Sequence, residues 1–95
     1  MKLNDIYTQV NRIGREDTTV GDHPYRYYDG NFEFSLTTGI VLKATRVRIR
    51  LERSDVYTWS TEGLSLVVDT DRDMDFMLWM DVTPALVTKV EKGKK

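Results

Sequence analysis

Three arginines that alternate with apolar residues could together bind an anionic partner. They lie in the stretch 45–52, and the period of two is typical of a β-strand with one buried and one exposed face. The arginines are Arg46, Arg48 and Arg50, and the apolar residues are Val47, Ile49 and Leu51. A tight link at Arg53-Ser54 would pair this strand with residues 55–60, which places Tyr57 opposite Arg50 and Trp59 opposite Arg48. We therefore expect a sheet face that combines guanidinium groups with two aromatic rings.

This face has three interpretations. Arginine, tyrosine and tryptophan are the typical hot spots of protein interfaces. Guanidinium groups that contact phosphate, beside rings that stack on bases, also suit single-stranded nucleic acid. Alternatively, the arginine stems only cover Tyr57 and Trp59 and keep the face soluble, with cation–π contacts as a minor gain. Because the chain has 15 acidic residues, which weaken any field that attracts phosphate, we favour a protein over a nucleic acid as the partner.

A second charged stretch carries aspartates at alternate positions before an apolar segment at 76–80. They are Asp69, Asp71, Asp73 and Asp75. Such a run can supply oxygen ligands to calcium, but Met74 stands where an EF-hand loop needs glycine and Met80 stands where it needs glutamate. The run is otherwise a solvated strand end or a contact surface for a basic partner. We assign no metal and no cofactor, and we count the four aspartates as candidate binding residues.

Catalysis finds little support in the sequence. It contains no glycine-rich phosphate loop, nucleophile elbow or metalloprotease motif. His23 is the only histidine, and it precedes Pro24 in a polar connection. The absence of cysteine excludes disulfides, Cys-ligated zinc, iron–sulfur clusters and thiol catalysis. We therefore expect a non-enzymatic protein that works in the cytoplasm, whether of its own cell or of a host, or in a virion.

The chain length limits the organisation to one domain, since 95 residues can build a single core but not two. The net charge of −1 and the 31% of charged residues are typical of a soluble protein. No apolar run is long enough to span a membrane, and the first residues lack a secretory signal, so we expect no membrane partner. Within the domain 1–95 we expect an N-terminal helix at 4–14, an antiparallel β meander at 24–90 and a basic tail at 91–95.

The N-terminal helix is predicted from its caps and its apolar stripe. Asn4 or Asp5 can cap the start, and Gly14 is well placed to end the helix. Its spacing puts most of the apolar side chains on one stripe, which must dock on the sheet or on a neighbour. These apolar residues are Leu3, Ile6, Tyr7, Val10 and Ile13.

A hairpin over Tyr25–Leu36 is predicted from the dipeptide Asp29-Gly30, which is typical of a type I′ turn. In that register Arg26 faces Glu33 across the strands. The opposite side gathers an aromatic cluster in which Tyr27 faces Phe32 and Tyr25 faces Phe34, and we expect this cluster to belong to the core rather than to form a ligand platform.

The next strand must bend. Thr37-Thr38-Gly39 predicts a second turn, after which the apolar positions Ile40 and Leu42 are even, whereas those of the arginine stretch are odd. A strand that keeps its apolar side inward must gain a residue between the two sets. We therefore predict a β-bulge near Ala44-Thr45, which would curve the sheet.

The last third of the chain predicts further strands. A three-residue loop at Thr61-Glu62-Gly63 would place three apolar residues opposite 56–60, namely Leu64, Leu66 and Val68. Residues 76–80 predict a short buried strand. Thr83-Pro84 either opens a helical turn or precedes a last strand whose apolar sites are Leu86 and Val90.

These elements predict an α+β fold that is mostly β, with a short N-terminal helix followed by a strongly bent antiparallel sheet of about five to seven strands. As architecture only, this order resembles the small barrels of the Sm-like and SH3-like type. The expected function is a non-enzymatic protein–protein interaction or assembly protein, which binds another protein or itself. Its most concrete form is a structural or accessory factor of a phage or mobile element, including an inhibitor whose acidic run mimics nucleic acid. The alternative is a nucleic-acid-binding small β-barrel that uses the arginine face.

Overall fold

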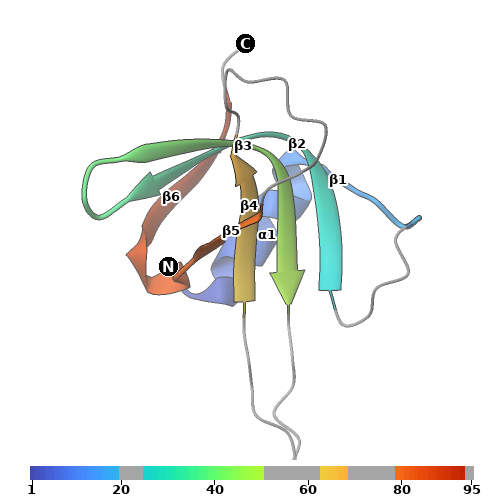
Figure 1. Ribbon diagram of the computed structural model, residues 1–95, viewed down its shortest axis with the longest axis horizontal. Helices are drawn as coiled ribbons and strands as arrows, with labels where there is room; N and C mark the ends of the chain where they lie inside the picture. The colour runs from blue at the N-terminus through green and yellow to red at the C-terminus, as the bar shows by residue number, and fades with distance from the viewer. Residues whose placement is uncertain (20–24, 51–62, 69–78, 94–95) are drawn as a thin grey trace, which may run out of the picture.

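The computed structural model describes residues 1–19, 25–50, 63–68 and 79–93. One helix precedes an antiparallel sheet, which confirms the predicted fold class (Figure 1). The elements in order are α1 (Leu3–Ile13), β1 (Arg15–Glu16), β2 (Tyr25–Leu36), β3 (Val41–Arg50), β4 (Gly63–Val68), β5 (Trp79–Val82), the 3₁₀ helix η1 (Pro84–Leu86) and β6 (Val87–Lys92). Since β6 extends to Lys92, the first residues of the expected tail belong to the sheet.

Helix α1 docks on the sheet through one face, as its apolar spacing predicts. The side chains of Leu3, Ile6 and Val10 are buried there, and Figure 1 shows the helix lying behind the sheet. The predicted cap by Asn4 or Asp5 is wrong, because the N-cap position is Lys2 and no side chain caps it. Packing of the apolar stripe therefore positions this short helix. No helix in the described ranges is long and apolar enough to cross a membrane.

The predicted hairpin over Tyr25–Leu36 is wrong. β2 continues through Asp29-Gly30 as one strand of 12 residues, and β3 pairs with it along both halves, with a register shift between Asp29 and Phe32. The predicted pair of Arg26 with Glu33 is therefore wrong as well. Arg26 instead donates a hydrogen bond to the Tyr7 hydroxyl.

Gly30, which suggested the hairpin, instead allows α1 and β2 to approach each other closely. At Gly30 a Cβ atom would lie 3.2 Å from the Cα of Gly14 and 3.1 Å from the ring of Phe32. At Gly14 a Cβ would overlap the Phe32 ring and lie 2.9 Å from the carbonyl oxygen of Asp29. Gly14 ends the helix as predicted, in an extended conformation (φ −103°). The two glycines let the end of the helix contact the strand across one phenylalanine ring.

Two predictions about the middle of the chain are confirmed. The turn at Thr37-Thr38-Gly39 joins β2 to β3, and Gly39 has the left-handed φ of +88° that favours glycine. The β-bulge near Ala44-Thr45 appears as a register shift between Ala44 and Arg46 in the pairing of β3 with β4. The shift in β2 lies at the same level, and Figure 1 shows both strands bending there.

The pairing predicted for the arginine strand is wrong. At Arg48 the partner on one side is Ser65 of β4, where Trp59 was expected, and on the other side it is Tyr27 of β2. β4 in turn pairs with β5, with Leu66 opposite Met80, so the expected pairing of β4 with residues 56–60 is also wrong. The predicted links at Arg53-Ser54 and Thr61-Glu62, and the segment 55–60 itself, lie outside the described residues.

The sheet has the order β1-β2-β3-β4-β5, and β6 returns to pair with β2. Within the described residues β5 does not pair with β6, so the sheet is not closed into a small barrel. Residues 76–78 of the predicted strand at 76–80 lie outside the described residues; Trp79 and Met80 belong to β5, and Met80 is 38% exposed where a buried residue was expected.

The region after Thr83 realises both predicted alternatives in succession, since η1 is followed by β6. Val87 and Val90 are buried, whereas Leu86 is 45% exposed and does not belong to the core as predicted. The buried core as a whole joins α1 to the sheet and comprises Leu3, Ile6, Val10, Tyr28, Phe32, Phe34, Ala44, Val47, Ile49, Leu64, Leu66, Val87 and Val90.

Candidate functional site

β3 positions the three arginines on the face of the sheet opposite the core. Val47 and Ile49 are fully buried, whereas the three arginines that alternate with them remain partly exposed. The alternation of the sequence therefore produces one apolar and one basic face, as expected for a strand with side-chain period two. Arg46, Arg48 and Arg50 all lie on the basic face.

The aromatic rings beside these arginines come from β2 and β5. The guanidinium carbon of Arg48 lies 4.8 Å from the ring centre of Tyr25 and 4.8 Å from that of Trp79. Arg50 lies 5.4 Å from the ring of Tyr25, and Arg46 lies 5.4 Å from the ring of Tyr27. These distances are typical of cation–π interactions. We call this array the arginine–aromatic ladder: Arg46, Arg48, Arg50, Tyr25, Tyr27 and Trp79.

The ring contacts connect the ladder into one unit. The rings of Tyr27 and Trp79 meet edge to face at 5.8 Å, and those of Tyr25 and Tyr27 lie 6.5 Å apart. The expectation that the aromatic cluster belongs to the core is therefore partly wrong: Phe32 and Phe34 are core residues, whereas Tyr25 lies against the arginines and Tyr27, although buried, contacts Arg46. The expected neighbours of the arginines, Tyr57 and Trp59, lie outside the described residues, as do Asp69, Asp71, Asp73 and Asp75.

Arg46, at one end of the ladder, is held by two carboxylates. Its Nη2 lies 3.0 Å from Asp17 and its Nη1 lies 3.6 Å from Asp29. The hydroxyl and backbone N–H of Thr19 both donate hydrogen bonds to Asp17, and these bonds, with a smaller contribution from Arg46, lower the pKa of this carboxyl below 3.8. Arg46 is therefore a structural cation that ties β3 to the segment after β1.

This lowered pKa predicts a pH-dependent contribution of Asp17 to stability. Ionised Asp17 stabilises the fold above its unfolded pKa of about 3.8, and the contribution is lost as the pH falls through the lower folded value. Asp17→Asn should lower the melting temperature at pH 7 and have a smaller effect at pH 3. Thermal unfolding of both proteins across this range measures the difference. An effect of Asp17→Asn that does not change with pH would contradict the assignment.

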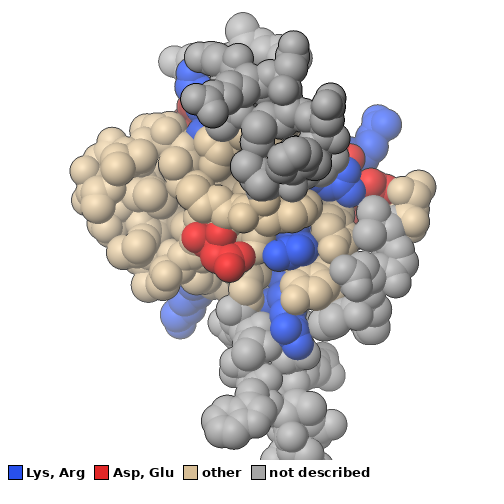
Figure 2. All heavy atoms as spheres, viewed as in Figure 1, with Lys and Arg blue, Asp and Glu red and all other residues tan. Residues whose placement is uncertain are grey.

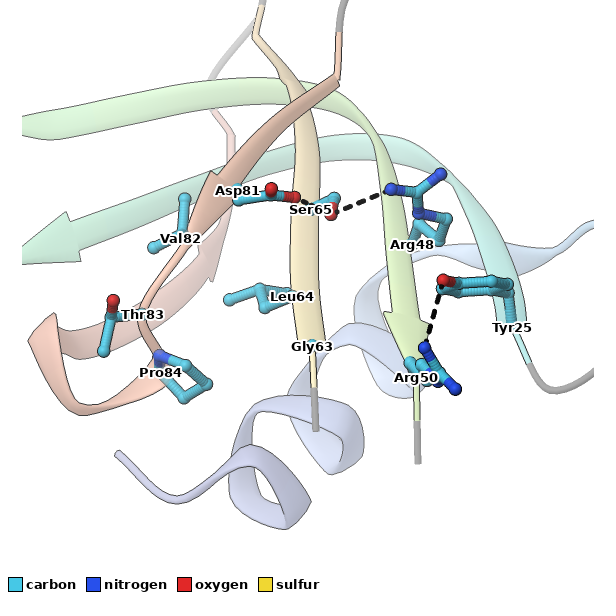
Figure 3. Close-up of a pocket in the computed structure, with 10 residues that line it drawn as sticks. All are labelled: Tyr25, Arg48, Arg50, Gly63, Leu64, Ser65, Asp81, Val82, Thr83 and Pro84. Atoms are coloured by element: carbon cyan, nitrogen blue, oxygen red, sulfur yellow. Dashed lines mark hydrogen bonds between the residues drawn. The ribbon is translucent and has the colours of Figure 1, made fainter. Parts of the chain in front are cut away.

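Arg48, in the middle of the ladder, has no ion pair with a described carboxylate. Its Nη2 donates a hydrogen bond of 3.2 Å to the hydroxyl of Ser65, which donates one of 2.7 Å to Asp81 (Figure 3). Ser65 is 5% exposed, so this hydroxyl is a buried bridge between the cation and the carboxylate. The Nε of Arg48 is buried and has no hydrogen-bond partner in the described part of the chain. Two rings and one hydroxyl thus fix the guanidinium group.

A groove of about 490 Å³ opens beside Arg48 and Arg50. Figure 3 shows β4 running between the arginines on one side and the β5–η1 segment on the other. The lining residues are Tyr25, Arg48, Arg50, Gly63, Leu64, Ser65, Asp81, Val82, Thr83 and Pro84. Its walls therefore combine two cations, one carboxylate and an apolar side.

The charges on this face are close together and mixed in sign. Figure 2 shows basic and acidic atoms side by side in the middle of the face, with uncharged atoms around them. No cluster of three His, Cys, Asp or Glu residues that could hold a metal ion occurs among the described residues, and His23 lies outside them. The described residues that line the groove can form ion pairs and hydrogen bonds with a ligand.

Comparison of the chain with protein-family models, with curated proteins and with solved structures finds no match.

Proposed function

We propose that this chain is a small non-enzymatic domain that binds another protein through the arginine–aromatic ladder and the groove beside it. The observation that carries the proposal is the environment of Arg48. This cation is fixed by Tyr25, Trp79 and Ser65, but it has no carboxylate partner among the described residues. A guanidinium group already held in one orientation loses little conformational entropy when a partner arrives.

A protein partner fits this face better than a nucleic acid. Binding of bases requires open ring faces for stacking, but guanidinium groups lie against the rings of Tyr25, Tyr27 and Trp79. The carboxylate of Asp81 lines the same groove and would repel phosphate. Arginine, tyrosine and tryptophan in a partly desolvated cluster are typical of protein hot spots.

The biological form of this function that we propose is an assembly or accessory factor of a phage or mobile element. It would act in the cytoplasm or in a virion. A small chain of 95 residues without cysteine supports this setting. The partner is either a second copy or another protein.

The first test combines light scattering with affinity capture. Wild type, Arg48→Ala and the control Lys89→Ala are compared in size-exclusion chromatography with light scattering and as baits in the source cells. Lys89 is an exposed residue of β6 that pairs with Glu91. We expect an oligomer or a captured protein that persists with Lys89→Ala and is lost with Arg48→Ala. A wild-type monomer that captures nothing, or complexes insensitive to Arg48→Ala, would contradict the proposal.

A second candidate function, binding of single-stranded nucleic acid, is favoured by the density of arginines and rings on one face. This function predicts binding that weakens steeply with salt and that depends on Arg48 and Trp79. Titration of a labelled oligonucleotide at about 50 mM salt gives phosphate contacts their best chance. Absence of binding under that condition would exclude this function.

A further inference from the structure

We infer that the groove beside Arg48 and Arg50 recognises a carboxylate on an acidic peptide segment of the partner. The inference rests on the proposed function, because it names the chemistry by which the ladder would select its partner. It is carried by three features of the described residues: the ionic state of Arg48, the shape of the groove above Gly63 and the position of Asp81.

The contrast between Arg46 and Arg48 indicates that the ligand carries a negative charge. The two residues lie on the same face of β3 and both contact aromatic rings. Arg46 is satisfied by Asp17 at 3.0 Å, whereas Arg48 has no such partner in the described ranges. A partly buried cation gains most from a charge-assisted, bidentate contact with an anion. The groove brings solvent to Arg48, so the missing anion can come from a ligand.

The groove has room for a side chain and a short stretch of backbone. Its volume of about 490 Å³ lies in the range of small-ligand sites. Among the described residues, a Cβ added to Gly63 would meet only the Cβ of Arg50, at 3.8 Å, which is an ordinary contact. As far as the described residues go, the absence of a side chain at Gly63 therefore leaves space in the groove next to Arg50. Val82 and Pro84 give the opposite wall an apolar surface.

Asp81 favours a carboxylate over a phosphate and orients it. Asp81 is exposed, receives the hydrogen bond from Ser65 and lines the same groove as the two arginines. The negative charge of Asp81 in the lining repels a doubly charged phosphate more strongly than a singly charged carboxylate. A peptide can also donate an N–H to Asp81 while its carboxylate faces Arg48. A ligand that combines an acidic side chain with a nearby donor fits this pattern.

The test is a ¹⁵N NMR titration of the whole chain with short synthetic peptides. Three pentapeptides share one sequence and carry aspartate, asparagine or phosphoserine at the centre. The aspartate peptide should shift the amides of Gly63, Ser65 and Arg48 and should bind at least about tenfold more tightly than the asparagine peptide. Inorganic phosphate serves as the fourth probe. Equal binding of the aspartate and asparagine peptides, or tighter binding of phosphoserine or phosphate, would overturn the inference.

Variants in the groove separate recognition from folding. Gly63→Val should block the peptide by filling the space next to Arg50, while Gly63→Ala should retain more of the affinity. Arg48→Lys keeps the charge but loses the bidentate geometry, so we expect intermediate binding between wild type and Arg48→Ala. Unchanged amide spectra away from the groove show that each variant is folded. Full binding by folded Gly63→Val would also overturn the inference.

Failure of this inference can be distinguished from failure of the proposed function. If no acidic peptide binds but Arg48→Ala still abolishes the protein complex, the face is an interface and the carboxylate assignment is wrong. If the complex is indifferent to Arg48→Ala, the proposed function is wrong and the inference fails with it.

Discussion

Phe32→Ala is expected to lower the free energy of unfolding by about 3–5 kcal/mol. Phe32 is fully buried at the register shift of β2. Its ring centre lies 6.2 Å from that of Phe34, and the ring fills the space beside Gly14 and Gly30. Removal of the ring leaves a cavity between α1 and the bent strand. Since small domains have about 5–15 kcal/mol of stability, this single change should remove a large part of it.

Urea denaturation of wild type and Phe32→Ala measures this loss. Ile40→Ala is the matched control, because it also removes a large apolar side chain, but from a position that is 55% exposed. We expect the control to change the stability by less than about 0.5 kcal/mol. Comparable losses for both variants would show that Phe32 does not have the role that its position assigns to it.

Gly14→Ala is expected to cost about 2–3 kcal/mol of stability, although alanine is the better residue in most helices. The added methyl group would overlap the Phe32 ring and approach the carbonyl oxygen of Asp29 to 2.9 Å. A backbone oxygen in the sheet cannot move aside as a flexible side chain can. Gly63→Ala is the control, since its methyl group would meet only Arg50 among the described residues, at an ordinary 3.8 Å.

A double-mutant cycle tests the cause of this cost. If the clash with the ring dominates, Gly14→Ala should cost much less in the Phe32→Ala background, because the cavity accommodates the methyl group. Chemical denaturation of the four proteins gives the coupling energy. Additive effects of the two substitutions would instead assign the cost of Gly14→Ala to the approach to Asp29 or to the backbone itself.

The features predicted correctly from the sequence are those that local periodicity determines. The apolar stripe Leu3, Ile6 and Val10 located the helix, and the change from even to odd apolar positions located the bulge near Ala44. The alternation of β3 also separated the arginines from the core. Burial of one face imposes these patterns directly, so they can be recognised without knowledge of the neighbouring strands.

The errors come from one dipeptide and from assumed pairing between neighbours in the chain. Asp29-Gly30 fits a type I′ turn, but Gly30 is needed for its close approach to Gly14, which only the docking of α1 creates. With a hairpin assumed there, Tyr25 and Tyr27 were placed in the core and could not be assigned to the arginines. When β2 and β3 are paired along their whole length, Tyr25 lies opposite Arg50 and Tyr27 lies opposite Arg48, so the rings and the arginines share one face. The aromatic half of the candidate site was therefore missed.

The pairing of β2 with β6 has a consequence for the order of events in folding. β2 and β3 are joined by a short turn and can form a hairpin early, but Phe34 also pairs with Val90, more than half the chain away. Contacts of such long sequence separation form slowly, because the intervening chain loses much entropy on closure. During synthesis the half of β2 that pairs with β6, residues 32–36, must keep one edge bare until residues 87–92 have left the ribosome. A nascent chain at that stage presents an open strand edge, which favours pairing with other chains and makes early aggregation the main competitor of folding.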